Sequence, residues 1–446
     1  MKRTILIIAP VSSRSGYGER SRDIVRALLA STEASKYELY IIDINWGNTP
    51  QTGLDPVKDS NILSRCLPTP QLQFQPDICI HITVPNEFQR VGKYLNIGMT
   101  AGIETTICSR EWIEGCNRMD LIITSSEHSK NVFKHTVYKL RNTQTGQETE
   151  LKVHAPVEVL FEGIRTDVFK RIESISNLDN KVVNMLSSQE IPENFCFLFT
   201  GHWLPGELGH DRKDVGMLVK TFLETFKQKM NPPALILKTG SVFSEMEREL
   251  ILSRLRSIYN MVSHSRELPN TYVIFGELTE SEMNSLYNHP KIKAHISFTK
   301  GEGYGRPLAE ASISAKPLIV SNWSGLIDFT EFAVKLPGHL TKLHPSAVWD
   351  KVLVPESAWF TVNYGYASTV LKDVFENYKN YEINAKKQAT LVRKQFDFDS
   401  MVLKFTEILK SYIGNKVPVL APLQLPTLTS LQLPTLISAD KKSDEK

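Results

Sequence analysis

The chain has 446 residues, of which 41% are hydrophobic and 23% charged, with a formal net charge of +3. This length and composition indicate a globular protein with two domains of ordinary size. Its apolar runs are all shorter than the ~20 residues that span a bilayer, so we expect no transmembrane segment. The small net charge neither requires nor excludes a nucleic-acid partner.

The cysteines indicate a reducing compartment. Their number is odd and no Cys-x-x-Cys pair occurs, which argues against a disulfide framework or a zinc site. We therefore expect free, mostly buried thiols and a cytoplasmic protein; the five positions are Cys66, Cys79, Cys108, Cys116 and Cys196.

Apolar runs and helical patterns alternate along the chain in two successive sets. Residues 4–9 form a continuous apolar run, as expected for a parallel strand buried on both faces, followed by a glycine turn at 15–18 and a helix at 19–29. Two such sets predict two doubly wound α/β domains, with ligands at the carboxyl ends of the strands. The remaining strands are expected at 37–42, 78–82, 94–99, 121–124, 157–161, 195–200, 234–238, 271–275, 294–298 and 317–320.

Composition also suggests where the domains end. We place the first domain at 1–171, a polar linker at 172–194 and the second domain at 195–366, followed by helices at about 367–413. Residues 139–154 are a polar insertion, interpreted as a hairpin. Residues 414–446 form a Pro-rich, low-complexity tail, in which prolines forbid a helix. The tail is either a docking peptide or without function.

The segment 297–312 is the most informative of the chain. A short strand ends in a loop with three alternating glycines, and Pro307 then opens a helix. The helix start directs free N–H groups at the space beyond the strand, and Glu302 and Glu310 frame that space. Carboxylates beside an anion-binding helix end suit a ligand with both hydroxyls and phosphates, such as a nucleotide sugar.

This segment resembles the Glu-x7-Glu signature of retaining glycosyltransferases of the GT-B fold, specifically the group 4 family, with local similarity to phage-encoded members. The following residues 316–328 resemble the family's next strand and glycine loop. The resemblance implies two Rossmann-like domains facing across a cleft, with a C-terminal helix crossing back to the first. It also implies transfer of a hexose or pentose from a nucleoside-diphosphate sugar, with neither metal nor cofactor.

The resemblance assigns roles to residues of the second domain. Glu310 would bind the ribose hydroxyls. Glu302, a catalytic residue, would contact the hydroxyls of the donor sugar and help to orient the transferred ring. The other expected donor-binding residues of these two loops are Gly303, Tyr304, Gly305, Ser324 and Gly325.

A basic element precedes this signature. Residues 211–216 resemble the family's Lys-Gly element, which places Lys213 against the diphosphate as a catalytic cation, with Arg212 or Lys238 assisting. The chain departs from the family in two ways: His202 replaces an arginine, and residues 204–210 are inserted.

The first domain is expected to supply the acceptor side. Gly16 and Gly18 resemble the family's glycine loop over the donor phosphates. Where the family often has a histidine, this chain has Glu104 as the nearest polar residue. Glu104 is the third expected catalytic residue, with a catalytic or acceptor-orienting role.

The acceptor stays open at this point: a glycan, a lipid, or a hydroxymethylated base in phage DNA, which would place the protein in a host cytoplasm. A rival interpretation is a non-catalytic sugar-nucleotide-binding protein of the same fold, which His202 and the missing histidine favour. A GT-B phosphorylase would require a pyridoxal-phosphate lysine, and no segment identifies one.

Overall fold

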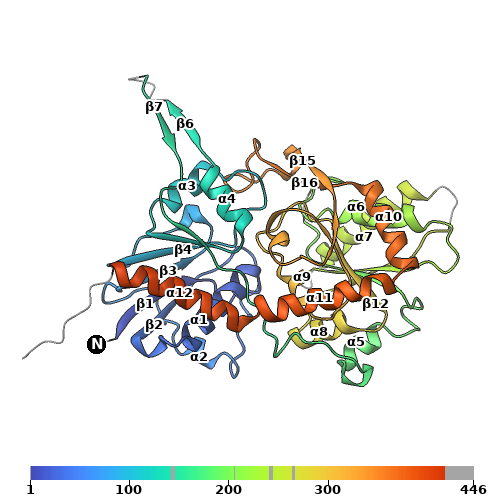
Figure 1. Cartoon of the computed structure of the whole chain (residues 1–446), viewed down its shortest axis with the longest axis horizontal. Coiled ribbons are helices and arrows are strands. Elements are labelled where there is room, and N and C mark those ends of the chain that lie inside the picture. The colour runs from blue at the N-terminus through green and yellow to red at the C-terminus, as the bar shows by residue number, and fades with distance from the viewer. Residues whose placement is uncertain (1, 142–145, 205, 241–244, 264–266, 417–446) are drawn as a thin grey trace, which may run out of the picture.

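The computed structural model describes residues 2–141, 146–204, 206–240, 245–263 and 267–416. Two six-stranded sheets, each with all strands parallel, form the centres of two domains that lie side by side in Figure 1. The order in the first sheet is β2 (Tyr37–Asp43), β1 (Arg3–Ala9), β3 (Ile78–Ile82), β4 (Leu95–Met99), β5 (Leu121–Thr124) and β8 (Val157–Val159). In the second it is β11 (Thr271–Phe275), β10 (Ala234–Thr239), β9 (Cys196–Thr200), β12 (Ile292–Ser297), β13 (Leu318–Ser321) and β14 (Val334–Leu336).

The strands form where the apolar runs predicted them. Every residue of β3, β4 and β5 is buried, because helices cover both faces of a parallel sheet. Strands β3, β5 and β11 have the predicted bounds, and β14 is an edge strand that the sequence did not indicate. The prediction of two doubly wound domains is therefore confirmed.

Helices connect the strands and cover the sheets. Near the first sheet they are α1 (Gly16–Ala30), α2 (Ser60–Leu63), α3 (Arg110–Cys116) and α4 (Glu127–His135). Near the second they are α6 (Val215–Phe226), α7 (Glu245–Val262), α8 (Glu280–Asn288) and α9 (Arg306–Ser312). The predicted linker contains the short helix α5 (Asn180–Met185), which packs against α8.

The three C-terminal helices divide between the domains. Helix α10 (Tyr364–Glu376) packs on α6, and α11 (Lys379–Gln395) packs on α9. Helix α12 (Phe398–Lys416) crosses to the first domain, where it contacts α1 and β4 (Figure 1). The expected return to the first domain thus applies to α12, whereas α10 and α11 pack on the second. Residues 417–446 of the predicted tail lie outside the described residues.

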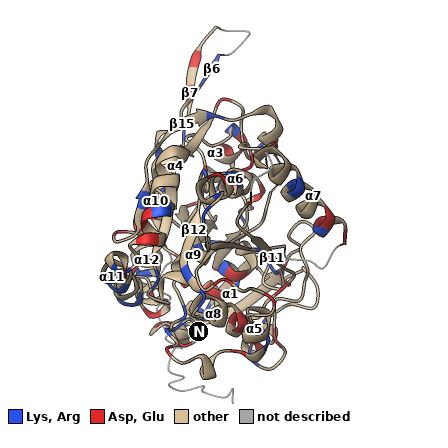
Figure 2. Cartoon of the chain, turned by 90° about the vertical axis from the view of Figure 1, so that its right-hand side faces the viewer, with Lys and Arg blue, Asp and Glu red and all other residues tan. Residues whose placement is uncertain are grey.

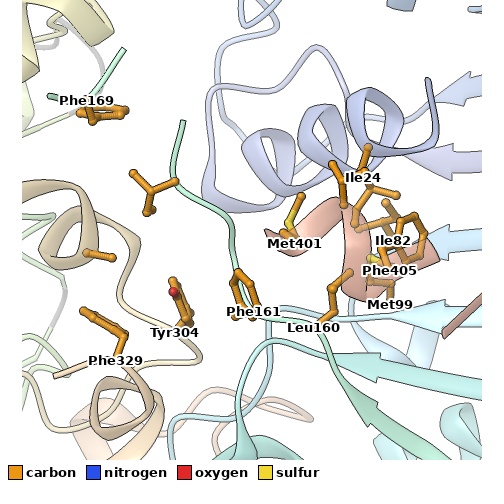
Figure 3. Close-up of a cluster of buried hydrophobic side chains, with 14 of the residues drawn as sticks. Ile24, Ile82, Met99, Leu160, Phe161, Phe169, Tyr304, Phe329, Met401 and Phe405 are labelled. Carbon is orange, nitrogen blue, oxygen red and sulfur yellow. The ribbon is translucent and has the colours of Figure 1, made fainter. Parts of the chain in front are cut away.

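An apolar cluster continues from one domain to the other. Figure 3 shows Phe161 between Tyr304 and Phe329 of the second domain and Met401 of α12. Phe396, just before α12, contacts both Phe161 and Phe329, with ring centroids 5.1 and 6.4 Å apart. This shared core joins the two domains.

Two hairpins extend from the domains. The pair β6 (Tyr138–Arg141) and β7 (Glu148–Leu151) projects from the first domain, within the range where a hairpin was predicted (Figure 1). The pair β15 (Gly338–Lys342) and β16 (Ala358–Val362) was not predicted. Ala358 of β16 exchanges two hydrogen bonds of 2.9 Å with Thr106 of the first domain, so this second hairpin bridges the domains.

The surface carries mixed charge. In Figure 2, both basic and acidic residues occur on helices such as α7 and α10. All five cysteines are free thiols, and Cys66 is the one that is not fully buried. Within the described ranges, no helix has the length and apolar character needed to cross a membrane.

Candidate functional site

The loop that carries Glu302 lies directly against the first domain. A Cβ atom on Gly301 would lie 2.0 Å from the Glu104 carbonyl oxygen, and one on Gly303 would lie 2.0 Å from that of Ala101. Only glycine permits so close an approach of two backbones. Ser125 strengthens the contact, since its hydroxyl donates to the Gly303 carbonyl at 3.1 Å.

Glu302 is the centre of an ionic network. Its carboxylate forms an ion pair with Lys213 through Oε1 and accepts a hydrogen bond of 3.2 Å from Arg212 through Oε2. Burial alone would raise the pKa of Glu302, but the charges of Lys213 and Arg212 outweigh it and hold the pKa below its usual value. Both carboxylate oxygens therefore carry charge and are engaged by fixed cations.

Backbone contacts hold Glu302 in place. Its N–H donates to the Ser324 hydroxyl at 2.9 Å, and its carbonyl accepts from the Gly325 N–H at 3.0 Å. Ser324 and Gly325, predicted to bind the donor, thus support the Glu302 loop.

Arg212 joins the two domains. It lies 3.5 Å from the Glu104 carboxylate across the cleft and donates to the Gly301 carbonyl at 2.9 Å. The three predicted catalytic residues, Glu302, Lys213 and Glu104, therefore belong to one network. Between 11% and 25% of each side chain in this network is exposed, so a ligand in the cleft can reach it.

His202 does not replace the family's cation. Burial, together with the charges of Lys213, Lys238 and Arg212, lowers its pKa to about 4, so the imidazole is neutral at physiological pH. Lys238 is buried, its ammonium lies 3.4 Å from the Gly240 carbonyl, and burial lowers its pKa to about 8. The fixed charge closest to Glu302 is thus supplied by Lys213 and Arg212.

Glu310 has a partner that the sequence did not indicate. Arg306, one turn earlier in α9, donates to it at 2.8 Å and also bonds Asp23 of α1 at 2.5 Å. Burial raises the pKa of Glu310 to about 7 despite the Arg306 charge. An arginine four residues before a glutamate was the available signal, but its contact with α1 depends on domain packing.

The glycine loop of the first domain contains Tyr17 between Gly16 and Gly18. The Tyr17 hydroxyl lies 2.8 Å from the Thr100 hydroxyl and accepts from the Ala101 N–H at 3.2 Å, and its ring stacks on Trp46 at 4.0 Å. Gly16 is exposed, and Gly18 is buried in the first turn of α1, where a Cβ atom would lie 1.9 Å from the Ser13 carbonyl oxygen. Sequence reasoning missed Tyr17, which lies within the predicted phosphate loop, and Trp46, which stacks on it.

Tyr304 and Gly305 have different surroundings. The Tyr304 side chain is buried against Phe329, with ring centroids 5.0 Å apart, and its hydroxyl has no hydrogen-bond partner among the described residues. Gly305 precedes α9 with φ of 101°. All three residues at 303–305 are buried, and their contact with a donor stays a prediction.

Over the described ranges, no group of three or more His, Cys, Asp or Glu side chains is placed to hold a metal ion. Metal independence stays a prediction.

Comparison with solved structures identifies the fold. No protein-family model matches the sequence, and no curated protein sequence matches it either. The structure of HepE from Anabaena with UDP and glucose superposes with a TM-score of 0.56 at 11% identity, over 92% of this chain and 100% of that one. Sucrose-phosphate synthase from Thermosynechococcus elongatus gives 0.59 at 11%, over 93% and 100%.

A glycosyltransferase from Rickettsia africae gives 0.59 at 14% identity, over 93% of this chain and 99% of that one. These structures share one architecture of two Rossmann-like domains across a cleft, and they cover nearly the whole chain. The chain therefore has the GT-B fold.

Proposed function

We propose that this chain is a retaining glycosyltransferase that moves a sugar from a nucleoside-diphosphate sugar to a hydroxyl acceptor without a metal ion. The observation that carries the proposal is the network in the cleft. Lys213 and Arg212 meet on the carboxylate of Glu302, and Glu104 approaches Arg212 from the opposite domain.

The chemistry requires cations at this place. When a sugar–phosphate bond breaks, negative charge develops on the departing diphosphate, and preorganised cations stabilise it in a site that excludes water. Lys213 offers a compact charge and Arg212 a forked donor. Glu302 holds both cations in position before the donor binds.

Glu302 and Glu310 suit recognition of hydroxyls. Both oxygens of Glu302 are engaged by cations, so this carboxylate orients the donor sugar and is not a free nucleophile. Retention then follows from attack on the face from which the phosphate departs. Glu310, at the first turns of α9, would accept from the ribose hydroxyls.

The acceptor belongs on the first-domain side, where Glu104 lies. A carboxylate there orients an acceptor hydroxyl and accepts its hydrogen bond. The HepE structure was solved with UDP and glucose, which makes UDP-glucose the first donor to test here. Acceptors to test are a glycan, a lipid and a hydroxymethylated base in DNA.

The first test measures binding and hydrolysis of UDP-, GDP- and ADP-sugars by the wild-type protein, with and without EDTA. We expect one donor to bind and to be hydrolysed slowly, at the same rate in EDTA. With methanol as a surrogate acceptor, NMR of the methyl glycoside should show the anomeric configuration of the donor. Glu302→Gln is the control, because it keeps the size of the side chain and removes its charge.

Each alternative has its own outcome. Binding of a donor without hydrolysis or transfer would favour a non-catalytic sugar-nucleotide-binding protein. Loss of activity in EDTA, restored by a divalent cation, would refute metal independence. If no donor binds, the whole proposal is wrong.

A further inference from the structure

A second ion pair lies beneath the site and contacts no solvent. The Lys300 ammonium is 3.2 Å from Asp214 Oδ2, and the exposed fractions of the two side chains are 1% and 0%. The Tyr364 hydroxyl donates to the same Asp214 oxygen at 2.6 Å, and Lys300 also donates to the Thr361 hydroxyl at 3.0 Å. We call Lys300, Asp214 and Tyr364 the buried triad.

The position of the triad in the chain connects it to the site. Asp214 directly follows Lys213, and Lys300 stands two residues before Glu302. Their backbones are also joined, because the Lys300 N–H donates to the Arg212 carbonyl at 2.7 Å. The triad therefore links the two loops whose side chains meet in the Lys213–Glu302 ion pair.

The arrangement is costly for the fold. Asp214 has a positive φ of 54° at the residue that precedes α6, a conformation that few non-glycine residues adopt, although aspartate tolerates it better than most. Its second carboxylate oxygen, Oδ1, is buried and accepts no hydrogen bond from the part of the chain that the structure describes. Buried ion pairs are often no more stabilising than apolar residues of the same volume. Stability alone therefore does not account for the triad.

The triad also connects the site to elements farther away. Tyr364 begins α10, and Thr361 lies in β16, whose Phe360 N–H donates to the Lys300 carbonyl at 3.0 Å. β16 is the strand that bonds Thr106 of the first domain. A shift of Lys300 or Asp214 would thus move Lys213 and Glu302 relative to each other and to the cleft.

We infer that Lys300, Asp214 and Tyr364 are positioning residues that set the place of the Lys213 ammonium relative to Glu302, without touching the substrate. This inference rests on the proposed function, because it assumes that Lys213 acts on the diphosphate. Misplacement of a catalytic group by about 1 Å can cost roughly 100-fold in rate. The triad should therefore govern turnover more than donor binding.

The test uses the double variant Lys300→Met/Asp214→Asn in the full chain. It removes both charges together, so that neither is left buried and unpaired, and asparagine tolerates positive φ. For the best hydrolysed donor we expect kcat to fall by at least about 10-fold while KM changes by less than about 3-fold. Circular dichroism and thermal melting check that the variant is folded.

Tyr364→Phe is a second, milder variant that removes one hydrogen bond and leaves the ion pair; its kcat should lie between those of the double variant and the wild type. The control is Lys229→Met/Glu376→Gln, which removes an exposed ion pair of 2.7 Å near α6 and α10. Its kcat should equal that of the wild type.

The outcomes separate this inference from the proposed function. A folded double variant with wild-type kcat overturns the inference alone. Equal loss of kcat, donor binding and melting temperature in the triad variants also overturns it, since that pattern indicates a structural role. A wild-type protein that binds and hydrolyses no donor overturns the proposed function, and the inference with it.

Discussion

At the residue scale, the site uses one carboxylate to hold two cations. Glu302 is nearly buried, and its pairing with Lys213 and Arg212 offsets the cost of removing each charge from water. A donor diphosphate would bring two further negative charges to the same cations. Lys213 and Glu310 should then affect different steps, because the proposed function assigns Lys213 to the charge that develops on the diphosphate and Glu310 to the ribose.

Lys213→Ala should lower kcat by roughly 100- to 1000-fold with little change in donor affinity, as removal of a transition-state charge partner does. Glu310→Ala should instead weaken donor binding by roughly 10- to 100-fold, through lost hydrogen bonds to a charged acceptor. Calorimetry gives the affinities, and donor hydrolysis gives kcat. Normal activity in both variants would disprove the assignment of the donor site.

Glu310 also predicts a pH dependence. Burial raises its pKa to about 7, so the carboxylate loses its proton as the pH rises through neutrality. The ionised form is the better acceptor for ribose hydroxyls, so affinity for a nucleoside diphosphate should increase between pH 6 and 8.

The matched variant for this measurement is Glu310→Gln, which cannot ionise. Its affinity for the nucleoside diphosphate should change with pH only because the phosphate groups of that ligand gain or lose protons. Identical pH profiles of the wild type and this variant would contradict the role of Glu310.

At the element scale, the backbone of the 301–305 loop lies directly against the backbone of the first domain at Ala101 and Glu104. Gly303→Ala would place a methyl group against the Ala101 carbonyl, which cannot yield as a flexible side chain would. We expect kcat to fall by roughly 100-fold, together with a lower melting temperature.

Gly414→Ala in α12 is the control for the glycine substitution. Among the described residues, no atom outside the neighbouring helix backbone lies within 4 Å of the added methyl group, and alanine stabilises a helix by about 0.5–1 kcal/mol relative to glycine. Its activity should match the wild type. Wild-type activity of Gly303→Ala would show that the two loops need not touch.

At the scale of the whole molecule, Arg306 joins the domains. It bonds Glu310 within α9 and Asp23 of α1, and Asp23 also pairs with Arg26 at 3.1 Å. Asp23 is 1% exposed, so its charge requires partners, which Arg306 and Arg26 supply. Unlike the charged residues on the surface, Arg306 and Asp23 are both buried.

Arg306→Met should destabilise the protein by roughly 1–3 kcal/mol, because Asp23 loses one of its two arginine partners and keeps Arg26. The double variant Arg306→Met/Asp23→Asn should recover part of that loss. Urea unfolding followed by fluorescence measures both. Equal stability of the single variant and the wild type would show that the domain contact does not depend on this pair.

Much of the fold and of the candidate site could be predicted from the sequence, because both depend on local pattern. Continuous apolar runs located most strands within one or two residues, and the Glu302–Glu310 segment combines glycines, a helix-starting proline and acids at fixed spacing. Residues that directly follow a strand must lie at the carboxyl edge of a parallel sheet. Those physical constraints act within a few residues of chain.

The contacts that tertiary structure alone decided join residues far apart in sequence. Arg306 reaches Asp23, Lys300 pairs with Asp214, and the unpredicted β15–β16 hairpin bonds Thr106. No periodicity encodes such pairs, because each depends on how two domains and a crossing helix pack. The sequence by itself indicated the strand-end loops and charged groups such as Glu302 and Lys213. The packing of the domains decided which groups meet, including pairs that the sequence did not indicate, such as Arg306 with Asp23.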